Sequence, residues 1–132
     1  MTAAHLASPS TNQQEAARIL HDLWARKGRF AALPENLRPA SRPEGYAVQQ
    51  AVEKLCGVPV SGWKIAATSV DGQRHINVDG PLAGRIYQDR VLPVGATISL
   101  DKNLMGVAEI EFAFRLGKTL SPRATAYTVD EV

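Results

Sequence analysis

Two glutamates set between apolar residues are the feature of this sequence best suited to chemistry. Residues 107–116 alternate in character, so a strand here would place Glu109 and Glu111 on one face and large apolar side chains on the other. Residues two apart in a strand lie roughly 6.5 to 7 Å apart, which lets the two carboxylates converge on one divalent cation. Without a cation they would repel each other by on the order of 2 to 3 kcal/mol at an effective dielectric of about 20 and a separation of about 6 Å.

The local pattern leaves two other interpretations of this pair open. Arg115 falls on the same face of the expected strand, where its guanidinium could relieve the repulsion between the glutamates. Many half-buried strands also carry acidic residues on a face that water covers. The alternation therefore predicts a strand, and a cation site is one of three interpretations of its acidic face.

A single lysine interrupts an apolar run nearer the middle of the chain. Residues 60–66 have the composition of a short strand, and Lys64 is its one charge, with Thr68 and Ser69 just beyond. One interpretation puts Lys64 on a solvent-exposed face or lets its stem snorkel to water. The other points it into a pocket, where desolvation or a neighbouring carboxylate would tune it.

An amphipathic helix is expected near the start of the chain. Apolar residues at helical spacing predict it over residues 13–27, with Asn12 and Glu15 as a capping box and Gly28 at its end. We expect the preceding residues 1–12 to form a flexible terminus.

A second helix follows a proline-rich connection over residues 30–43. Ser41 supplies its N-cap, Pro43 stands in its first turn, and the apolar spacing runs on to Gly57. Cys56, near its end, is the one cysteine of the chain, which excludes an internal disulfide. It is expected to act as a small apolar residue.

Turn residues and short apolar runs alternate in the rest of the chain. We expect turns at 71–72 and 79–81, a strand pair over 91–100 that bends at 93–95, and a helix that opens with a capping box at 128–131. His21 and His75 have no partner at metal-binding spacing and are assigned no chemistry. A helix that opens so close to Val132 leads us to expect the front part of a longer protein.

Composition narrows the class of protein. With 132 residues, 45% of them hydrophobic and 21% charged, the chain has the make-up of one soluble globular domain. The net charge of +2 is spread out and no aromatic platform accompanies it, so we expect no nucleic-acid partner. The first residues form neither a signal peptide nor a membrane span, and we expect a cytoplasmic protein with no membrane partner.

Several short motifs occur along the chain in an order that one enzyme family shares. After the first helix come Tyr46-Ala47-Val48-Gln49, Gly62-Trp63-Lys64-Ile65 with Thr68-Ser69, the Gly80-Pro81 turn with Gly84, and Glu109-Ile110-Glu111-Phe112-Ala113-Phe114. Together they resemble the 2-keto-4-pentenoate hydratases of the fumarylacetoacetate hydrolase superfamily, which also includes 4-oxalocrotonate decarboxylases. The resemblance runs from about residue 13 to the last residue.

This resemblance implies a metal site and a catalytic lysine. Glu109 and Glu111 match two carboxylates that hold Mg²⁺ or Mn²⁺, and Lys64 matches the active-site lysine. The third carboxylate ligand of the family would lie beyond Val132. Hard oxygen ligands suit Mg²⁺ or Mn²⁺, and such sites keep open positions for substrate and water.

The implied reaction is hydration of a 2-oxo-4-enoate in the breakdown of aromatic compounds. A 2-oxo acid can chelate the ion through its keto and carboxylate oxygens, so the metal acts as a Lewis acid on the carbonyl. Lys64 would be an electrostatic partner of the substrate or an acid/base group. A decarboxylase or a carbon–carbon hydrolase of the same superfamily, and a non-catalytic fragment or subunit, are the alternatives.

One position departs from the family pattern. The family hydratases usually have an aspartate directly after the proline of the turn, whereas this chain has Leu82 there and Asp79 two residues before Pro81. Thr68 and Leu82 are the implied substrate-binding positions, and Asp79 is the candidate replacement for the missing aspartate.

The resemblance also implies an architecture. We expect an α+β fold in which N-terminal helices pack on a mixed β-sheet or roll of the fumarylacetoacetate hydrolase type, with residues 13–132 as the N-terminal part of the catalytic domain. The full-length protein is expected to be a homo-oligomer.

Overall fold

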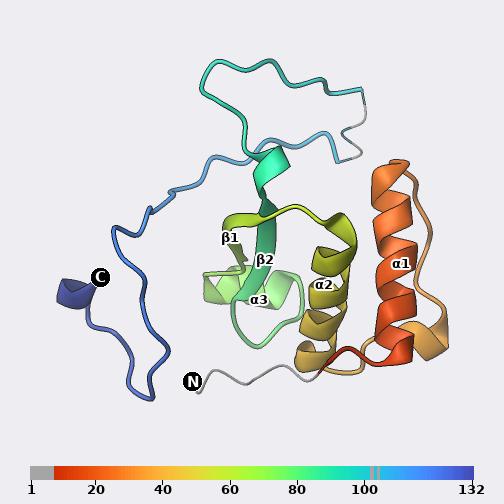
Figure 1. Cartoon of the computed structure of the whole chain (residues 1–132), viewed down its shortest axis with the longest axis horizontal. Coiled ribbons are helices and arrows are strands. Elements are labelled where there is room, and N and C mark those ends of the chain that lie inside the picture. The colour runs from red at the N-terminus through yellow and green to blue at the C-terminus, as the bar shows by residue number, and fades with distance from the viewer. Residues whose placement is uncertain (1–7, 102, 104) are drawn as a thin grey trace. The chain divides into compact units, whose positions relative to one another are not determined.

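The computed structural model of the protein describes residues 8–101, 103 and 105–132, and these fall into two units. The first, Ser8–Ile98, contains both long helices and both strands, and the second includes Ser99–Val132. In chain order the elements are α1 (Thr11–Ala25), a 3₁₀ turn (Glu35–Leu37), α2 (Arg42–Cys56), β1 (Val60–Ala66), α3 (Val70–His75), β2 (Leu82–Tyr87) and 3₁₀ turns at Gln88–Arg90 and Val129–Glu131 (Figure 1). Among the described residues, none of these helices has the length and apolarity to span a membrane.

Helix α1 begins two residues earlier than the sequence predicted. Ser10 is the N-cap: its Oγ accepts a hydrogen bond from the Gln13 N–H at 3.3 Å, and Gln13 Oε1 accepts one from the Ser10 N–H at 2.8 Å. The predicted Asn12–Glu15 capping box is wrong, because Asn12 lies inside the helix and its amide donates to the Asn36 carbonyl instead. Thr11 and Asn12 are therefore helical and not part of a flexible terminus, while residues 1–7 lie outside the described residues.

Helix α2 confirms the signals read from the sequence. Ser41 is its N-cap and accepts a hydrogen bond from the Glu44 N–H at 3.4 Å, while Glu44 Oε2 accepts one from the Ala40 N–H at 2.8 Å. The helix ends at Gly57, whose φ of 64° is the left-handed conformation that glycine adopts without strain. Cys56 is the last helical residue.

The core of this unit lies between α1 and α2, which run side by side (Figure 1). Ala16 and Ala17 of α1 are fully buried against Val48 and Ala51 of α2. Small side chains at these positions let the two helix backbones approach closely. Larger apolar residues surround this contact, namely Leu20, Leu33, Leu37 and Val52.

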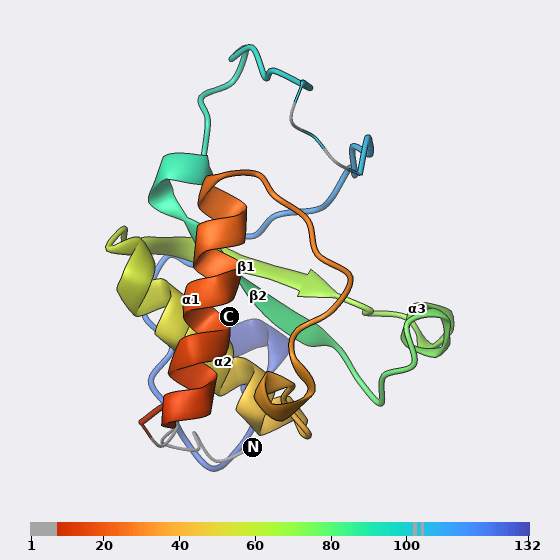
Figure 2. The same ribbon diagram turned by 90° about the vertical axis from the view of Figure 1, so that its right-hand side faces the viewer.

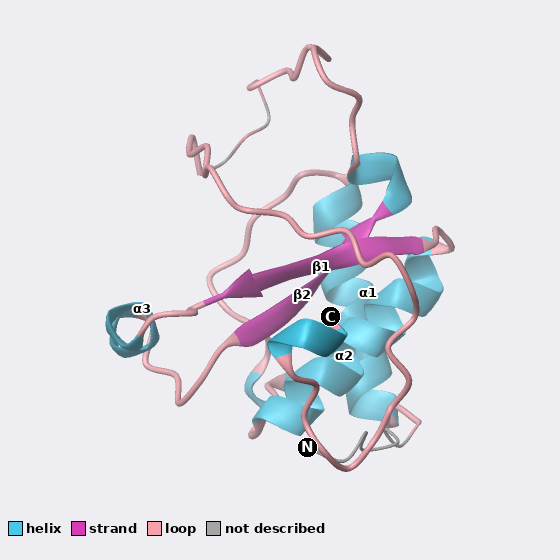
Figure 3. Ribbon diagram, turned by 90° about the vertical axis from the view of Figure 1, so that its left-hand side faces the viewer, coloured by secondary structure: helices cyan, strands magenta, loops and turns pink. Residues whose placement is uncertain are grey.

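The two strands form an antiparallel pair beside the helices (Figure 2). The predicted strand over residues 60–66 is confirmed as β1, and its partner β2 pairs from Ala66↔Leu82 to Val60↔Tyr87 with one irregularity near Gly62. Helix α3 stands at the far end of the pair, away from α1 and α2 (Figure 3). The structure is thus α+β, and the larger mixed sheet or roll stays a prediction.

Helix α3 replaces the turn predicted at residues 71–72. Ser69 acts as its N-cap and accepts a hydrogen bond from the Gly72 N–H at 3.1 Å. Asp71 in the first turn and Arg74 in the last complement the helix dipole. These local interactions favour a short helix over an open turn at this position.

The predicted strand pair over residues 91–100 is wrong. A turn does occur at its expected bend, where the Ala96 N–H donates to the Pro93 carbonyl at 3.1 Å, but no strand is assigned on either side of it. Leu92 before the bend is 50% exposed, and Ile98 and Leu100 after it are 66% and 70% exposed, so the apolar side chains of both flanks remain largely uncovered.

The strand predicted over residues 107–116 is not formed either. This segment of the unit Ser99–Val132 is described throughout, and no strand is assigned to it. Ile110, Phe112 and Phe114 are 92% to 103% exposed, so the apolar side of the alternation is not covered. Alternation supplies the side-chain pattern of a strand, but a strand also needs a neighbouring backbone for its hydrogen bonds.

The capping box predicted at residues 128–131 is confirmed, although it opens a 3₁₀ turn. The Thr128 N–H donates to Glu131 Oε2 at 2.8 Å, and the Thr128 side chain caps the same turn. Arg123 adds a bidentate ion pair with Glu131, at 2.6 and 2.8 Å. The turn is therefore held by its polar groups, since Val129 is 92% exposed.

The close helix contact predicts that α1 tolerates no larger side chain at its buried alanines. Ala17→Leu adds three carbon atoms where Ala17 has no exposed surface, and overpacking of this kind costs about 1 to 3 kcal/mol. Chemical denaturation followed by circular dichroism should show this loss of unfolding free energy. Lys54→Leu on the exposed side of α2 is the control, and equal stability of the two variants would contradict the packing described.

Candidate functional site

Lys64 and Leu82 project from the same face of the strand pair. The register places Lys64 opposite Gly84 and Ala66 opposite Leu82, so that Lys64 and Leu82 are diagonal neighbours. Lys64 is partly buried, and it is less exposed than its strand neighbours Trp63 and Ile65, which lie on the other face and are 53% and 45% exposed. The lysine therefore lies on the more buried face of β1, and Gly84 leaves space beside it because it has no side chain.

Thr68 lies in the short connection from β1 to α3. It is exposed, and it sits between Ala67, which adopts a left-handed φ of 55°, and the N-cap Ser69. A β-carbon in the left-handed region is uncommon, so this connection is a sharply turned one.

A cleft of about 690 Å³ opens beside Leu82, between α2 and the turn that precedes β2. Its lining includes Leu82 and Asp79 from that turn and strand, and Arg42, Tyr46 and Gln49 from α2. Leu82 thus contributes an apolar surface where the family pattern has a carboxylate. Asp79 lines the same cleft, so a carboxylate is present here two residues before Pro81.

Asp79 is neutralised by α2. Arg42 Nη2 forms an ion pair with the Asp79 carboxylate, and the same guanidinium donates to the carbonyls of Pro81 at 3.1 Å and Gly80 at 3.4 Å. The Asp79 side chain is 92% exposed at the rim of the cleft. Arg42 therefore ties the whole turn to the start of α2.

Glu109 and Glu111 belong to the unit Ser99–Val132 and are both exposed. Two carboxylates are the oxygen donors that Mg²⁺ and Mn²⁺ prefer, so the pair fits such an ion in donor type. Within the described residues, no group of three histidine, cysteine or acidic side chains gathers at one point. The pair by itself would make an open, two-donor site.

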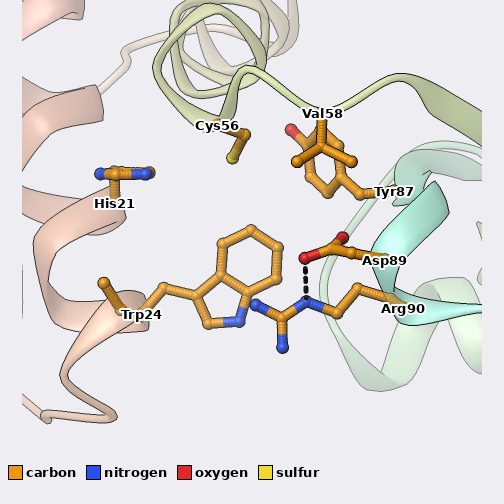
Figure 4. Close-up of a pocket in the computed structure, with 8 residues that line it drawn as sticks. His21, Trp24, Cys56, Val58, Tyr87, Asp89 and Arg90 are labelled. Carbon is orange, nitrogen blue, oxygen red and sulfur yellow. Dashed lines mark ion pairs between the residues drawn. The ribbon is translucent and has the colours of Figure 1, made fainter.

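A smaller pocket of about 110 Å³ lies where the C-terminal ends of α1 and α2 meet the end of β2. Figure 4 shows the side chains around it: His21 and Trp24 from α1, Cys56 and Val58 at the end of α2, and Tyr87, Asp89 and Arg90 from the end of β2 onward. Arg90 stacks over the Trp24 ring at 4.7 Å and pairs with Asp89 at 3.5 Å. The sequence predicted no chemistry for His21 or Cys56, and their place in one pocket was not among its predictions.

Tyr87 is the buried polar group of this pocket. Its side chain is 5% exposed and its ring lies 5.7 Å from that of Trp24. Burial raises the pKa of the Tyr87 phenol from 10.0 to about 12, and the neighbouring Cys56 thiol adds to the rise. Burial thus favours the neutral phenol of Tyr87 in this pocket between the ends of α1, α2 and β2.

Sequence reasoning missed the role of the polar residues on α2. Tyr46 and Gln49 entered the sequence analysis only as part of a family motif, and Arg42 was not singled out, yet all three line the cleft. Their spacing of four and three residues places them on one face of a helix, and this periodicity is the signal that could have found them. It was obscured because the apolar face of α2 has the same periodicity.

The chain is similar to two curated hydratases. Over 78 residues it is 36% identical to the TodF product hydratase of Pseudomonas putida (strain F1), a match that covers 57% of this chain and 29% of that protein. Over 140 residues it is 28% identical to 2-keto-4-pentenoate hydratase 1 of Dechloromonas aromatica (strain RCB), which covers 96% of this chain and 53% of that protein. The chain therefore spans about half of the second relative and under a third of the first.

No family model matches the chain, and no solved structure does. The two relatives support the hydratase resemblance that the sequence motifs indicated. Membership of the wider superfamily stays a prediction.

The raised pKa of Tyr87 predicts a late step in an alkaline titration. Phenolate absorbance of the chain should include a component near pH 12 that Tyr87→Phe removes, with Tyr127→Phe as the control that retains it. Because folding raises this pKa, its contribution to stability is present below about pH 10 and is lost as the pH rises through about 12. Persistence of the late component in Tyr87→Phe would show that another group produces it.

The ion pair of Glu131 predicts a late step in an acid titration. The Arg123 guanidinium, with help from the Thr128 N–H, lowers the pKa of the Glu131 carboxyl from 4.5 to about 2. This stabilisation of the turn is present above about pH 4.5 and is lost as the pH falls through about 2. Carbon-13 NMR of the Glu131 carboxyl should show it, and Arg123→Ala should move the midpoint upward; a midpoint that stays put in this variant would exclude Arg123 as the cause.

Proposed function

We propose that this chain carries active-site residues of a divalent-metal-dependent hydratase that adds water to a 2-oxo-4-enoate such as 2-keto-4-pentenoate. The observation that carries the proposal is the similarity, along 96% of the chain, to a protein named 2-keto-4-pentenoate hydratase. Because the chain spans about half of that relative, the activity of the whole protein is part of the proposal. The half-buried position of Lys64 beside the cleft residue Leu82 supports it.

In this proposal Glu109 and Glu111 hold the metal ion. Their carboxylates are oxygen donors of the type that Mg²⁺ and Mn²⁺ take. When bound, the ion supplies Lewis acidity to the keto oxygen of the substrate. Further donors, from substrate, water or protein, would complete the coordination.

Lys64 handles charge and protons at the substrate. An ammonium group on the half-buried face of β1 can donate to a substrate oxygen, and partial desolvation strengthens that interaction. Leu82 contributes apolar surface to the cleft in place of the usual aspartate, which favours a substrate with an apolar tail at that point. Asp79, held by Arg42, keeps the rim of the cleft polar.

Metal uptake in the presence of a substrate mimic tests the proposal. Calorimetry with Mn²⁺ and oxalate, whose two adjacent carboxylates imitate the chelating end of a 2-oxo acid, should show binding to the full chain. Glu109→Gln with Glu111→Gln should abolish it, because both proposed donors lose their charge. Glu15→Gln on the exposed surface of α1 is the matched control and should bind as the unaltered chain does.

A hydration assay gives the second readout. Water addition breaks the conjugation of the dienol form of the substrate, so its ultraviolet absorbance should fall in the presence of the chain and Mg²⁺, and Lys64→Met should slow this decay. No Mn²⁺ uptake by the unaltered chain, or equal uptake by the double variant, would refute the metal role. Metal uptake without any hydration would refute the assignment of this chain as a hydratase.

A further inference from the structure

One side of α2 carries a row of polar residues that all contact the segment around β2. We call this row the polar stripe of α2, and it consists of Arg42, Tyr46, Gln49 and Glu53. Successive members are three or four residues apart, so they lie along one face of the helix. Their contacts advance along the chain from the turn at residues 79–81, through Ala83, to Arg85.

The middle of the stripe binds the backbone of β2. The Ala83 N–H donates to Tyr46 Oη at 3.1 Å, and the Ala83 carbonyl accepts a hydrogen bond from Gln49 Nε2 at 3.2 Å. Both groups of Ala83 are thereby directed to the helix, at the outer edge of a two-stranded sheet. A strand edge normally leaves such groups to water or to another strand.

The C-terminal part of the stripe fixes a charged side chain of the same strand. Arg85 donates to Glu53 Oε2 at 2.6 Å and to Gln49 Oε1 at 3.1 Å, and its guanidinium lies 5.0 Å from the Trp63 ring. The Arg85 side chain is 10% exposed and the Glu53 side chain 38%, so the guanidinium is largely desolvated while the carboxylate keeps contact with water. The hydrogen bond between them is charge-assisted. Gln49 joins the two parts, because its amide group contacts both Ala83 and Arg85.

The N-terminal end of the stripe holds the turn before the strand. Arg42 binds the Asp79 carboxylate and the carbonyls of Gly80 and Pro81, as described above. The residues on either side of Leu82 are therefore both anchored to α2, at the turn by Arg42 and at Ala83 by Tyr46 and Gln49. Leu82 itself is left to line the cleft.

We propose that the polar stripe of α2 is a positioning device, in which Arg42, Tyr46 and Gln49 hold the segment from Asp79 to Ala83 on α2. They thereby set the shape of the cleft beside Leu82, the diagonal neighbour of Lys64. The positioning stands on the contacts themselves, and its catalytic meaning rests on the proposed hydratase function. The stripe residues act through the backbone that they hold. They are positioning residues and need not touch substrate.

Amide hydrogen exchange of the full chain, followed by NMR, tests the proposal. Tyr46→Phe removes the acceptor of the Ala83 N–H and keeps the aromatic ring, so exchange at Ala83 should become about five- to tenfold faster. Gln49→Glu keeps an acceptor for Arg85 but loses the donor to Ala83, and should also speed exchange there. Tyr127→Phe, whose hydroxyl binds Ser121 in the other unit, is the matched control and should leave Ala83 unchanged.

Two outcomes would overturn the proposal. Unchanged exchange at Ala83 in both variants would show that the hydrogen bonds do not hold the strand. Equal acceleration at the amides of α1 and α2 would show that the stripe residues stabilise the whole unit and have no local positioning role. The local result expected here is therefore one that general destabilisation would not produce.

The hydration assay separates this proposal from the proposed function. If the chain is a hydratase, Tyr46→Phe should lower kcat/KM by about tenfold, because misplacement of a cleft wall weakens alignment of the substrate. Faster exchange at Ala83 in a chain with no hydratase activity would support the stripe and refute the function. Hydration that proceeds equally well after Ala83 has been loosened would refute the catalytic meaning of the stripe and leave the function standing.

Discussion

The backbone edge of β2 must find hydrogen-bond partners, and the way in which it does so organises the unit Ser8–Ile98. A sheet of two strands has two open edges and little stability of its own. At Ala83 the side chains of Tyr46 and Gln49 supply the partners that a third strand would otherwise provide. Helix α2 therefore has two tasks: its apolar face packs on α1, and its polar face completes the sheet edge.

The contact between α2 and the segment around β2 also pairs the charged side chains of this unit. A guanidinium that loses most of its water, as Arg85 does, must be paired with an acceptor or it would destabilise the fold, and Glu53 and Gln49 are placed to do this. At the other end of α2, Arg42 compensates the Asp79 carboxylate. The cleft beside Leu82 is thus bordered by groups whose charges are balanced within the protein, which leaves its apolar surface available to a ligand.

The residues proposed for chemistry occur in two different structural settings. Lys64 is part of a strand and inherits its direction from the register with β2. Glu109 and Glu111 lie in a segment without a ladder partner among the described residues, and their apolar neighbours Ile110 and Phe112 are almost fully exposed. The carboxylate pair therefore has the composition of a metal site, while its geometry depends on whether this segment acquires a neighbouring strand.

Local signals in the sequence determined the parts of the fold that depend on neighbouring residues. The Ser41 cap and the end of α2 at Gly57 were predictable because helix caps depend on interactions within a few residues. The strand over residues 60–66 was recognisable from its composition, and it forms because β2 supplies its hydrogen-bond partner. The capping residues of α1 were misplaced although the signal is local here too, since Ser10 and Gln13 form the reciprocal capping box. Asn12 lies inside the helix, and its side chain donates to the Asn36 carbonyl.

The sequence by itself also determined which residues can do chemistry, since Lys64, Glu109 and Glu111 were recognisable by type and spacing. Tertiary structure alone decided that residues 107–116 do not form a strand, that Asp79 is paired with Arg42, and that Tyr46 and Gln49 hold Ala83. The physical reason is that each of these outcomes depends on a hydrogen-bond or charge partner more than thirty residues away, or on the lack of one among the described residues. Alternation and spacing determine which side chains a segment presents, and only the folded chain determines which hydrogen-bond and charge partners they contact.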